Sequence, residues 1–383
     1  MTGNKAVWGG GISCEQGSSP TISDCTINFN SAVAGGGIYC QGGIEGKSSP
    51  IITNCTIIGN TARSSMLPRA GAGIECYSSS PTIINCKISD NSVDDGADGA
   101  ISCSWGSLLT ISNSTISKNK TSGIFCLESS LIVNNCTITG NKGREGGGIA
   151  SYRFSTTTIT NCIIRDNSPQ QIDGTASVTY SDVQDGWPGQ GNINTDPCFV
   201  QPGYWADVND PNIIVEPNDP NAVWLEGDYH LLPFSPCIDT GDPNYIPEAN
   251  ETDLDGNPRI SGTRIDMGAY EANYIEAEMN FTPKTINCNS KGNWVKAHFT
   301  LPDGFLPEDV DINEPAWAEP MHIQSEYIKV LGSNPVKLEI AFDREAFCAR
   351  ITETGQLEVT IIDSLITGQR FYASDSIKII SQR

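Results

Sequence analysis

The oxygen-bearing residues best suited to hold a cation lie in one turn, the DLDGN segment at 253–257. Alternate side-chain oxygens followed by a glycine that allows a sharp bend are the way a Ca²⁺-binding loop begins. A complete loop also needs a distal acid at a fixed spacing, and Asp266 does not fall at that spacing. The turn makes Asp253, Asp255 and Asn257 candidate Ca²⁺ ligands, with a hydrogen-bonded Asx turn as the alternative. We expect no other cofactor.

Aromatic residues recur in a glycine-rich strand motif, GGGIxC, in the first half of the chain. Because successive side chains of a strand point to opposite faces, the isoleucine and cysteine share one face and their neighbours share the other. Aromatic rings along a flat ribbon can stack on sugar rings, while polar neighbours bond to hydroxyl groups. We predict a glycan-binding platform on this outer face, formed by Tyr39, Gln41, Glu75, Tyr77, Phe125 and Tyr152. The alternative is that the long loops at 41–50 and 61–72 fold over the rings and bury them.

Residues suited to catalysis are sparse in this pattern. Cleavage of an acidic polysaccharide on such a face requires a base beside carboxylates that hold Ca²⁺, or several aspartates at one spot. The acids at the outward positions are isolated, and the nearest base is Arg153. The sequence contains no metal-ligand motif of the CxxC or HExxH type and no histidine before His230. His298 and His322 fit ordinary strand or loop positions. The sequence favours a structural or adhesive protein, with a polysaccharide lyase or glycoside hydrolase as the alternative.

Short strands that repeat every 23 to 36 residues must position these side chains. The GGGIxC motif carries an isoleucine at the same point of each repeat, namely Ile12, Ile38, Ile74, Ile101, Ile124 and Ile149. A second motif follows each one, as in TISDCTINFN and IVNNCTITGN. Short β-branched runs broken by Gly, Asn and Ser are strands, so each repeat supplies about three strands and forms one coil. The sequence therefore predicts an all-β protein built on a right-handed parallel β-helix of about seven coils.

An asparagine follows the cysteine or serine of the second motif at a constant distance of five residues. These asparagines are Asn30, Asn60, Asn91, Asn119, Asn141 and Asn167. Coils that stack ~4.8 Å apart bring identical residues into columns. A carboxamide carries both a donor and an acceptor, so stacked amides can bond to each other or to turn backbone. We predict a structural ladder, and the alternative is a row that binds a ligand.

Ten of the fourteen cysteines fall in two columns of the coils. Ser114 and Ser151 each replace one cysteine in a coil where the other column keeps its own. If the two columns were joined by disulfides, both cysteines of a coil would be lost together. Because serine replaces them one at a time, we interpret both columns as small residues packed in the core. We predict that ten thiols are reduced and buried, those of Cys14, Cys25, Cys40, Cys55, Cys76, Cys86, Cys103, Cys126, Cys136 and Cys162. The sequence leaves open the state of the other four, Cys198, Cys237, Cys288 and Cys348.

Pattern and charge divide the chain into three parts. Residues 1–180 carry the coils, and residues 181–277 form an acidic segment that caps the solenoid. The net charge is −22 for the whole chain and −17 over 176–278 alone. Over 278–383, apolar residues alternate with period two between turns, which predicts an antiparallel β-sandwich of the Ig or fibronectin type. A protein with this much negative charge repels phosphate backbones, and we therefore do not expect nucleic acid as a partner. The acidic segment serves either solubility or cation binding.

No apolar run approaches the roughly 18 residues that a membrane span needs. The residues 1–5 include no apolar stretch, so this chain shows no signal peptide. Either a signal peptide has been removed or the chain starts inside a longer, exported protein, and because the repeat begins close to residue 8 we favour the second. The strand at 8–14 would then have an open edge, which predicts an upstream capping segment or end-to-end self-association.

The acidic segment contains VTYSDVQDGWPGQGN, TDPCFV, GDYHLLPFSPCIDTGDP, TDLDGNPRISG and RIDMGAYE. Together with the SSPTI–NCTI–GN coils, these segments resemble bacterial right-handed parallel β-helix proteins, which are pectate-lyase-like solenoids with an anchor-type terminal cap, abundant in planctomycete-like genomes. The resemblance covers residues 7–272. It implies an extracellular or cell-surface location and surface components or polysaccharides as partners, and most members lack an established activity.

The cap of that family has acidic motif positions, matched here by Asp239, Asp242, Asp253, Asp255, Asp266 and Glu271. This chain departs from the family by Cys198, where an apolar residue is usual, and by an insertion at 203–226. Whether Cys198 pairs with Cys237 stays open. Residues 278–383 also resemble an Ig-like module that follows such β-helices, which implies a role in spacing or attachment.

Overall fold

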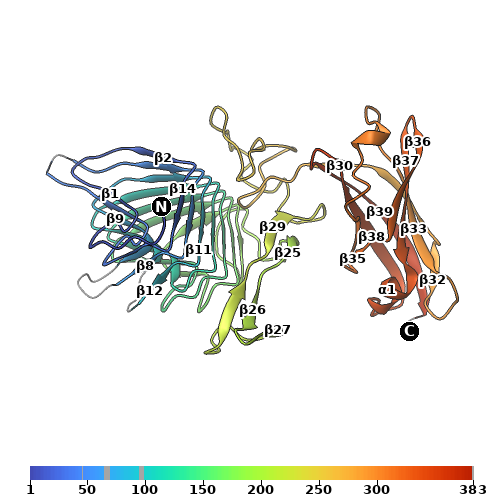
Figure 1. The fold of residues 1–383 in the computed structure, drawn as a ribbon, viewed down its shortest axis with the longest axis horizontal. Helices are drawn as coiled ribbons and strands as arrows, with labels where there is room; N and C mark the ends of the chain where they lie inside the picture. The colour runs from blue at the N-terminus through green and yellow to red at the C-terminus, as the bar shows by residue number, and fades with distance from the viewer. Residues whose placement is uncertain (45, 64–69, 95–98, 382–383) are drawn as a thin grey trace. The chain divides into compact units, whose positions relative to one another are not determined.

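The computed structural model describes residues 1–44, 46–63, 70–94 and 99–381. The chain forms two compact units, Met1–Ala272 and Asn273–Arg383. Each unit has its own apolar core. The first unit holds the coils and the acidic segment, and the second is the C-terminal sandwich (Figure 1).

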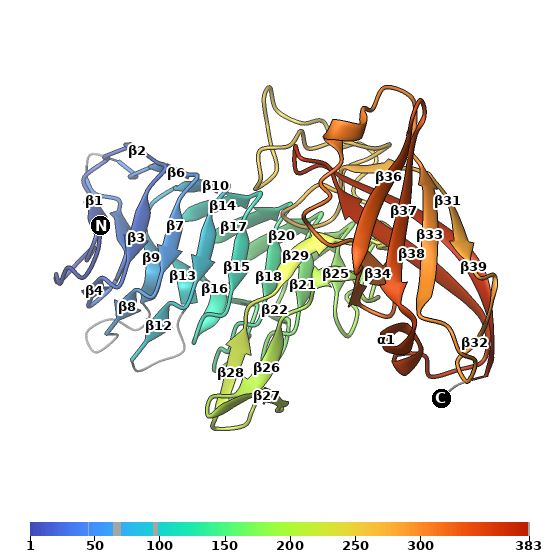
Figure 2. The same cartoon turned by 45° about the vertical axis from the view of Figure 1, so that its right-hand side comes forward.

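Three seven-stranded parallel sheets form the solenoid, and each contributes one strand to every coil (Figure 2). The first sheet is β1 (Ile12–Cys14), β5 (Ile38–Gln41), β9 (Gly71–Tyr77), β13 (Gly99–Ser104), β16 (Ser122–Leu127), β19 (Ile149–Tyr152) and β22 (Ile172–Gly174). The second is β2 (Thr21–Ser23), β6 (Ile51–Thr53), β10 (Thr82–Ile84), β14 (Leu108–Ser112), β17 (Ser130–Asn134), β20 (Thr156–Thr160) and β23 (Ser177–Thr179). The third is β3 (Thr26–Asn28), β7 (Thr56–Ile58), β11 (Lys87–Ser89), β15 (Thr115–Ser117), β18 (Thr137–Thr139), β21 (Ile163–Arg165) and β24 (Asp182–Val183). The predicted right-handed parallel β-helix is confirmed.

A short fourth sheet, β4 (Ser31–Ala32), β8 (Thr61–Ala62) and β12 (Ser92–Val93), follows the third sheet in the first coils. The segment before β1 lies along the open side of this corner, because Thr2 bridges to Asn28 and Lys5 bridges to Ser31. The first strands of the first and second sheets, β1 and β2, each have a strand neighbour on one side only. The described residues thus cover part of the solenoid's first edge, and among them β1 and β2 have no second strand neighbour.

The solenoid interior consists of stacked isoleucines and thiols. Ile12 pairs with Ile38 and Cys14 with Cys40, and the same register continues from coil to coil. All ten columnar cysteines are free. Nine are buried, whereas Cys25, beside the terminal strand β3, is only half-buried. For Cys25, the predicted burial is wrong.

The six predicted asparagines form one continuous row of hydrogen bonds. The Nδ2 of each donates to the Oδ1 of the next, at 2.8–3.1 Å. The backbone N–H of each donates to the same oxygen. Asn4 extends the row at one end and Gln171 at the other, and sequence analysis assigned neither. The row satisfies buried backbone groups that the strands leave unpaired at this corner.

A second row of Asx residues marks the corner between the second and third sheets. Each of these residues lies in the left-handed region, with φ of 50–54°. Asparagine and aspartate tolerate that conformation better than other side chains that carry a Cβ. The row, called here the corner row, consists of Asp24, Asn54, Asn85, Asn113, Asn135 and Asn161.

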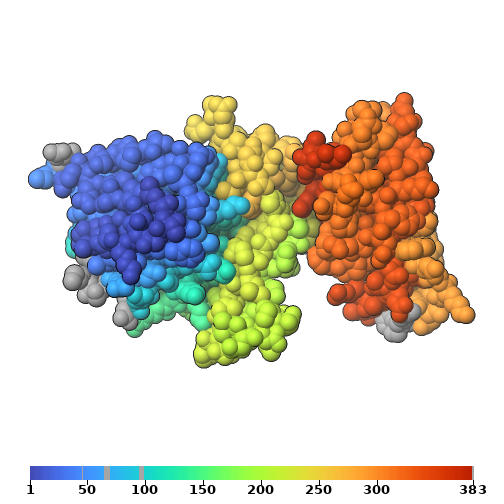
Figure 3. All heavy atoms as spheres, viewed as in Figure 1, coloured from blue at the N-terminus to red at the C-terminus, as the bar shows by residue number. Residues whose placement is uncertain are grey.

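The acidic segment folds onto the third sheet. Strand β25 (Phe199–Gln201) pairs with β29 (Asp228–Leu231), and their apolar residues share a core with Ile163. The insertion forms a separate three-stranded sheet, called here the arm: β26 (Tyr204–Asp207), β27 (Asp210–Ile214) and β28 (Ala222–Leu225). In Figure 3, the arm is the yellow-green lobe beside the coils. Cys198 and Cys237, whose pairing the sequence left open, are both free.

The second unit is a β-sandwich. One sheet holds β30 (Tyr274–Glu276), β39 (Arg370–Ser381), β38 (Gly355–Ser364), β34 (Trp317–Glu319) and β35 (Ile323–Gln324), with β32 (Thr285–Asn287) beside β39. The other holds β31 (Glu278–Thr282), β33 (Trp294–Thr300), β37 (Val336–Asp343) and β36 (Tyr327–Ser333). Both are antiparallel except where β30 and β32 pair with β39. A disulfide joins Cys288 to Cys348, which lies in the short helix α1 (Arg344–Ala349).

Candidate ligand-binding groove

The predicted aromatic platform is covered. Tyr39, Glu75 and Phe125 are only 4%, 1% and 0% exposed, so the prediction of exposed rings is wrong for the first sheet. The side chains do point away from the solenoid core, as strand alternation requires, but they enter small clusters of their own. Trp8 stacks on Tyr39 with 5.3 Å between ring centroids, and the alanines of the segments leading into the strands complete the cover.

The other platform residues are half-buried, namely Gln41, Tyr77 and Tyr152. Glu75 accepts a hydrogen bond from the backbone N–H of Gly71 at 2.7 Å, so its carboxylate serves the local turn. Residues 45 and 64–69 of the loops expected to cover the rings lie outside the described residues. The six residues therefore do not form an open surface.

The candidate Ca²⁺ turn is held by N–H donors. Asp253 Oδ1 accepts from the backbone N–H groups of Asp255 at 3.0 Å and Asn257 at 2.7 Å. Its Oδ2 accepts from Asn257 Nδ2 at 3.1 Å and from the N–H of Glu271 at 2.9 Å. Both oxygens are thus committed to donors, which is the arrangement of an Asx turn. Across the described residues, no group of three or more His, Cys, Asp or Glu side chains is placed to hold a metal.

Asp255 points instead toward His230, a residue to which sequence analysis gave no role. His230 Nε2 lies 2.6 Å from Asp255 Oδ2, and Nδ1 contacts Asp228. Burial opposes protonation of the ring, but the two hydrogen-bonded carboxylates outweigh it and raise the pKa of His230 to about 9. The hydrogen bond from His230 lowers the pKa of Asp255. The sequence could have indicated the pairing of His230 with Asp228, because the two residues are two positions apart on β29. It could not indicate the contact with Asp255, which the fold brings about.

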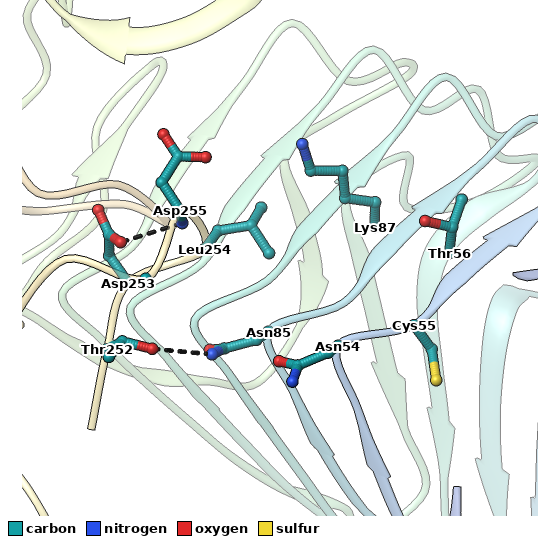
Figure 4. Close-up of a pocket in the computed structure, with 10 residues that line it drawn as sticks. Asn54, Cys55, Thr56, Asn85, Lys87, Thr252, Asp253, Leu254 and Asp255 are labelled. Atoms are coloured by element: carbon teal, nitrogen blue, oxygen red, sulfur yellow. Dashed lines mark hydrogen bonds between the residues drawn. The ribbon is translucent and has the colours of Figure 1, made fainter. Parts of the chain in front are cut away.

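The loop at 242–257 runs along the corner row and encloses a groove. Asn113 Nδ2 donates to Glu251 Oε1 at 2.9 Å, and Asn135 Nδ2 donates to the hydroxyl of Tyr245 at 3.0 Å. Asn85 Nδ2 donates to Thr252 Oγ1 at 3.2 Å, as Figure 4 shows. These bonds hold the loop in place, so that the loop forms one wall of the groove and the corner row forms the other.

The groove consists of two adjoining hollows of about 660 and 370 Å³. They share Asn54, Asn85 and Thr252. Figure 4 shows the carboxamides of Asn54 and Asn85 next to each other in the smaller hollow. Asn54 is exposed, and the buried Oδ1 of Asn85 has no hydrogen-bond partner among the described residues.

Hydroxyls and amides dominate the lining. The outer face of the second sheet provides Ile84 from the third coil, and Thr53, Thr110, Ser112 and Asn134 from the second, fourth and fifth coils. Such groups both donate and accept, and they recur at the ~4.8 Å spacing of the coils. The loop adds Glu248, Glu251 and Asp255, and Lys87 is the one lysine among the described residues that line the groove. The groove can therefore bond to a hydroxyl-rich chain and disfavours a polyanion.

The coils match a known family. Residues 10–185 match the family described as right handed beta helix region, a family that includes polysaccharide lyases and hydrolases. The match ends at β24, so the groove loop, the arm and the sandwich lie beyond it. No curated protein matches the chain. Among the described residues, no helix is long and apolar enough to cross a membrane.

Proposed function

We propose that this protein is an exported, cell-surface β-helix protein that binds a hydroxyl-rich polysaccharide chain in the groove beside the corner row. The observation that carries the proposal is the lining of that groove, where outward hydroxyls and amides repeat from coil to coil. A rigid solenoid holds these groups at fixed positions before the ligand arrives, which reduces the ordering cost of binding.

Two further observations support an extracytoplasmic location. The Cys288–Cys348 disulfide is of the kind that persists in oxidising compartments. Most of the free thiols are buried, which protects them from oxidation in such a compartment.

Affinity electrophoresis with one blocking variant tests the groove. Thr110 lies on the outer face of β14 and lines the larger hollow, so Thr110→Trp should fill it. Thr158 lies in the same row, two coils further on β20, and does not line the hollow. Thr158→Trp is therefore the matched control.

We expect neutral polysaccharides to retard the wild-type protein and the Thr158→Trp variant, and not the Thr110→Trp variant. All three should melt at the same temperature, because both positions face outward. Equal retardation of the two variants would place the binding site elsewhere. A wild-type protein that no neutral polysaccharide retards would overturn the proposal.

Polysaccharide cleavage is a second candidate function, favoured by one observation. Lys87 and Asp255, with its carboxylate held ionised by His230, line the same hollow. A base and a carboxylate in one pocket are the minimum for acid–base chemistry on a sugar. If this pocket is catalytic, wild-type protein should release reducing ends or unsaturated uronates and Lys87→Met should not. Absence of both products would remove this candidate.

A further inference from the structure

A second cleft lies at the opposite end of the third-sheet strands, between the arm and the turns that follow β11, β15 and β18. Its volume is about 570 Å³. The solenoid wall holds three lysines, Lys118, Lys120 and Lys142, together with Asp90 and Gly140. Apolar side chains of the arm form the other wall, namely Trp205, Val208, Val223, Trp224 and Leu225. The cleft shares no residue with the groove beside the corner row.

The asparagine ladder places two of these lysines one above the other. Lys120 follows the rung Asn119, and Lys142 follows the next rung, Asn141. The backbone N–H of Lys142 donates to the carbonyl of Asn119 at 2.9 Å, so the two lysines hold equivalent positions in successive coils. Their backbones are therefore ~4.8 Å apart. Like charges this close repel each other unless an anion lies between them.

The cationic charge of this wall is only partly neutralised. Lys118 Nζ lies 3.2 Å from Asp90 Oδ2. Lys142 Nζ donates to the backbone carbonyl of Asp219 at 3.2 Å, which carries no formal charge. Lys120 is exposed and has no ion pair among the described residues. A basic wall of this kind contrasts with the net charge of −17 over residues 176–278.

The arm wall is rigid and apolar. The indole N–H of Trp205 donates to the carbonyl of Asp166 at 3.1 Å, and that of Trp224 donates to the hydroxyl of Tyr229 at 3.0 Å. A Cβ on Gly140 would lie 2.3 Å from the Trp224 ring, so only glycine leaves room for the indole there. Both indoles are buried, so the accessible carbon surface of this wall comes from Val208, Val223 and Leu225.

We infer that this cleft binds a sulfate or phosphate ester carried on a sugar ring. Such an ester has three terminal oxygens that can each accept from one ammonium group, and three lysines line the cleft. The apolar wall suits the C–H face of the ring. A carboxylate has only two oxygens and matches this wall less well. The inference does not depend on the groove, whose lining suits neutral chains.

Affinity electrophoresis in dextran sulfate, dextran and polygalacturonate tests the inference, because the first two share one backbone and differ in the ester. Lys120→Gln/Lys142→Gln removes the stacked pair. The matched control is Lys5→Gln/Lys47→Gln, with the same change in net charge. Lys5 follows the rung Asn4 as Lys120 follows Asn119, and it does not line the cleft. All four lysines are at least partly exposed, so both variants should fold.

We expect dextran sulfate to retard wild-type protein more than dextran or polygalacturonate does. The Lys120→Gln/Lys142→Gln variant should bind dextran sulfate about tenfold more weakly, which corresponds to about 1.4 kcal/mol. The control should bind as the wild type does. Equal weakening in the control, or polygalacturonate binding as tight as that of dextran sulfate, would overturn the inference. Thr110→Trp should leave dextran sulfate binding unchanged, so failure of the groove and failure of the cleft are distinguishable.

Discussion

His230 links two parts of the acidic segment through its two carboxylate partners, Asp228 on β29 and Asp255 in the groove loop. Its ring also stacks on Tyr270, with 4.0 Å between centroids. The pKa of about 9 in the folded chain lies above the ordinary value of about 6.5. The charged ring therefore stabilises the fold fully below about pH 6.5, and this stabilisation disappears as the pH rises through about 9.

We predict that the first unit of the wild-type protein melts at a lower temperature at pH 9.5 than at pH 6.5, and that His230→Gln reduces this difference. Glutamine keeps a hydrogen-bonding side chain and cannot take up the proton. Tyr270 does not titrate in this window, because burial raises its pKa further above the ordinary value. Scanning calorimetry at the two pH values measures the effect. The same loss in both proteins would show that other groups cause it.

Asn119 is the residue in the middle of the ladder, and it is buried. Its amide donates to Asn141 Oδ1 at 2.8 Å and to the carbonyl of Ile88 at 3.1 Å, and its Oδ1 accepts from Asn91. Asn119→Leu leaves these partners unsatisfied inside the solenoid. Each such group costs about 1–3 kcal/mol, so we predict a loss of at least about 3 kcal/mol in the free energy of unfolding.

The exposed end rung provides the control. The side chain of Asn4 donates to Asn30, and water can replace this exposed bond, so Asn4→Leu should cost no more than about 1 kcal/mol. Urea denaturation of the two variants measures the difference. Equal losses would mean that the ladder contributes no more in the interior than at its end.

At the scale of the element, the coils could be predicted from the sequence because every coil stacks on a copy of itself. The isoleucine, cysteine and asparagine columns follow directly from the repeat, and Ile12 lies beside Ile38 as the motif requires. The outer face could not be predicted in this way. Trp8 and the alanines that cover Tyr39 lie in segments that differ from coil to coil, so no period reveals them.

The groove also lay beyond sequence reasoning. Its defining contacts join residues far apart in the chain, such as Asn113 and Glu251, which are 138 positions apart. The corner row itself was visible as an Asx residue before each cysteine, but its partner loop was not. The acidic positions of the cap were visible too, and only the structure shows that Asp253 binds N–H groups.

The cysteine columns give a prediction for the strands that carry them. Twelve cysteines are free, and only Cys25 and Cys198 among them are half-exposed. A hydrogen bond to the thiol of Cys126 and burial raise the pKa of Cys103 well above its ordinary value, so its thiolate is scarce. We predict that a thiol reagent modifies at most two groups rapidly in the native protein and twelve in denaturant. Fewer than ten in denaturant would indicate disulfides within the coils.

At the scale of the whole molecule, the two units have separate cores and should respond separately to changes in either one. The Cys288–Cys348 bridge closes a loop of 60 residues within the second unit. Removing such a bridge costs about 2–5 kcal/mol. We predict that Cys288→Ala/Cys348→Ala lowers the melting transition of the sandwich and leaves that of the solenoid unchanged. A shift of both transitions by the same amount would show that the units unfold together.

The asparagine ladder has a direction, because the Oδ1 of each rung always accepts from the rung of the coil before and never from the coil after. All interior rungs are therefore interchangeable, and only Gln171 differs, since it closes the series with its own amide. The rungs are 22 to 31 residues apart in sequence and still meet, so the spacing between them is free to vary. A whole coil can thus be removed or duplicated without mismatching its neighbours. The length of the solenoid can thus change by whole coils, but the coils that contact the groove loop, from Asn85 to Asn135, are needed to keep that loop in place.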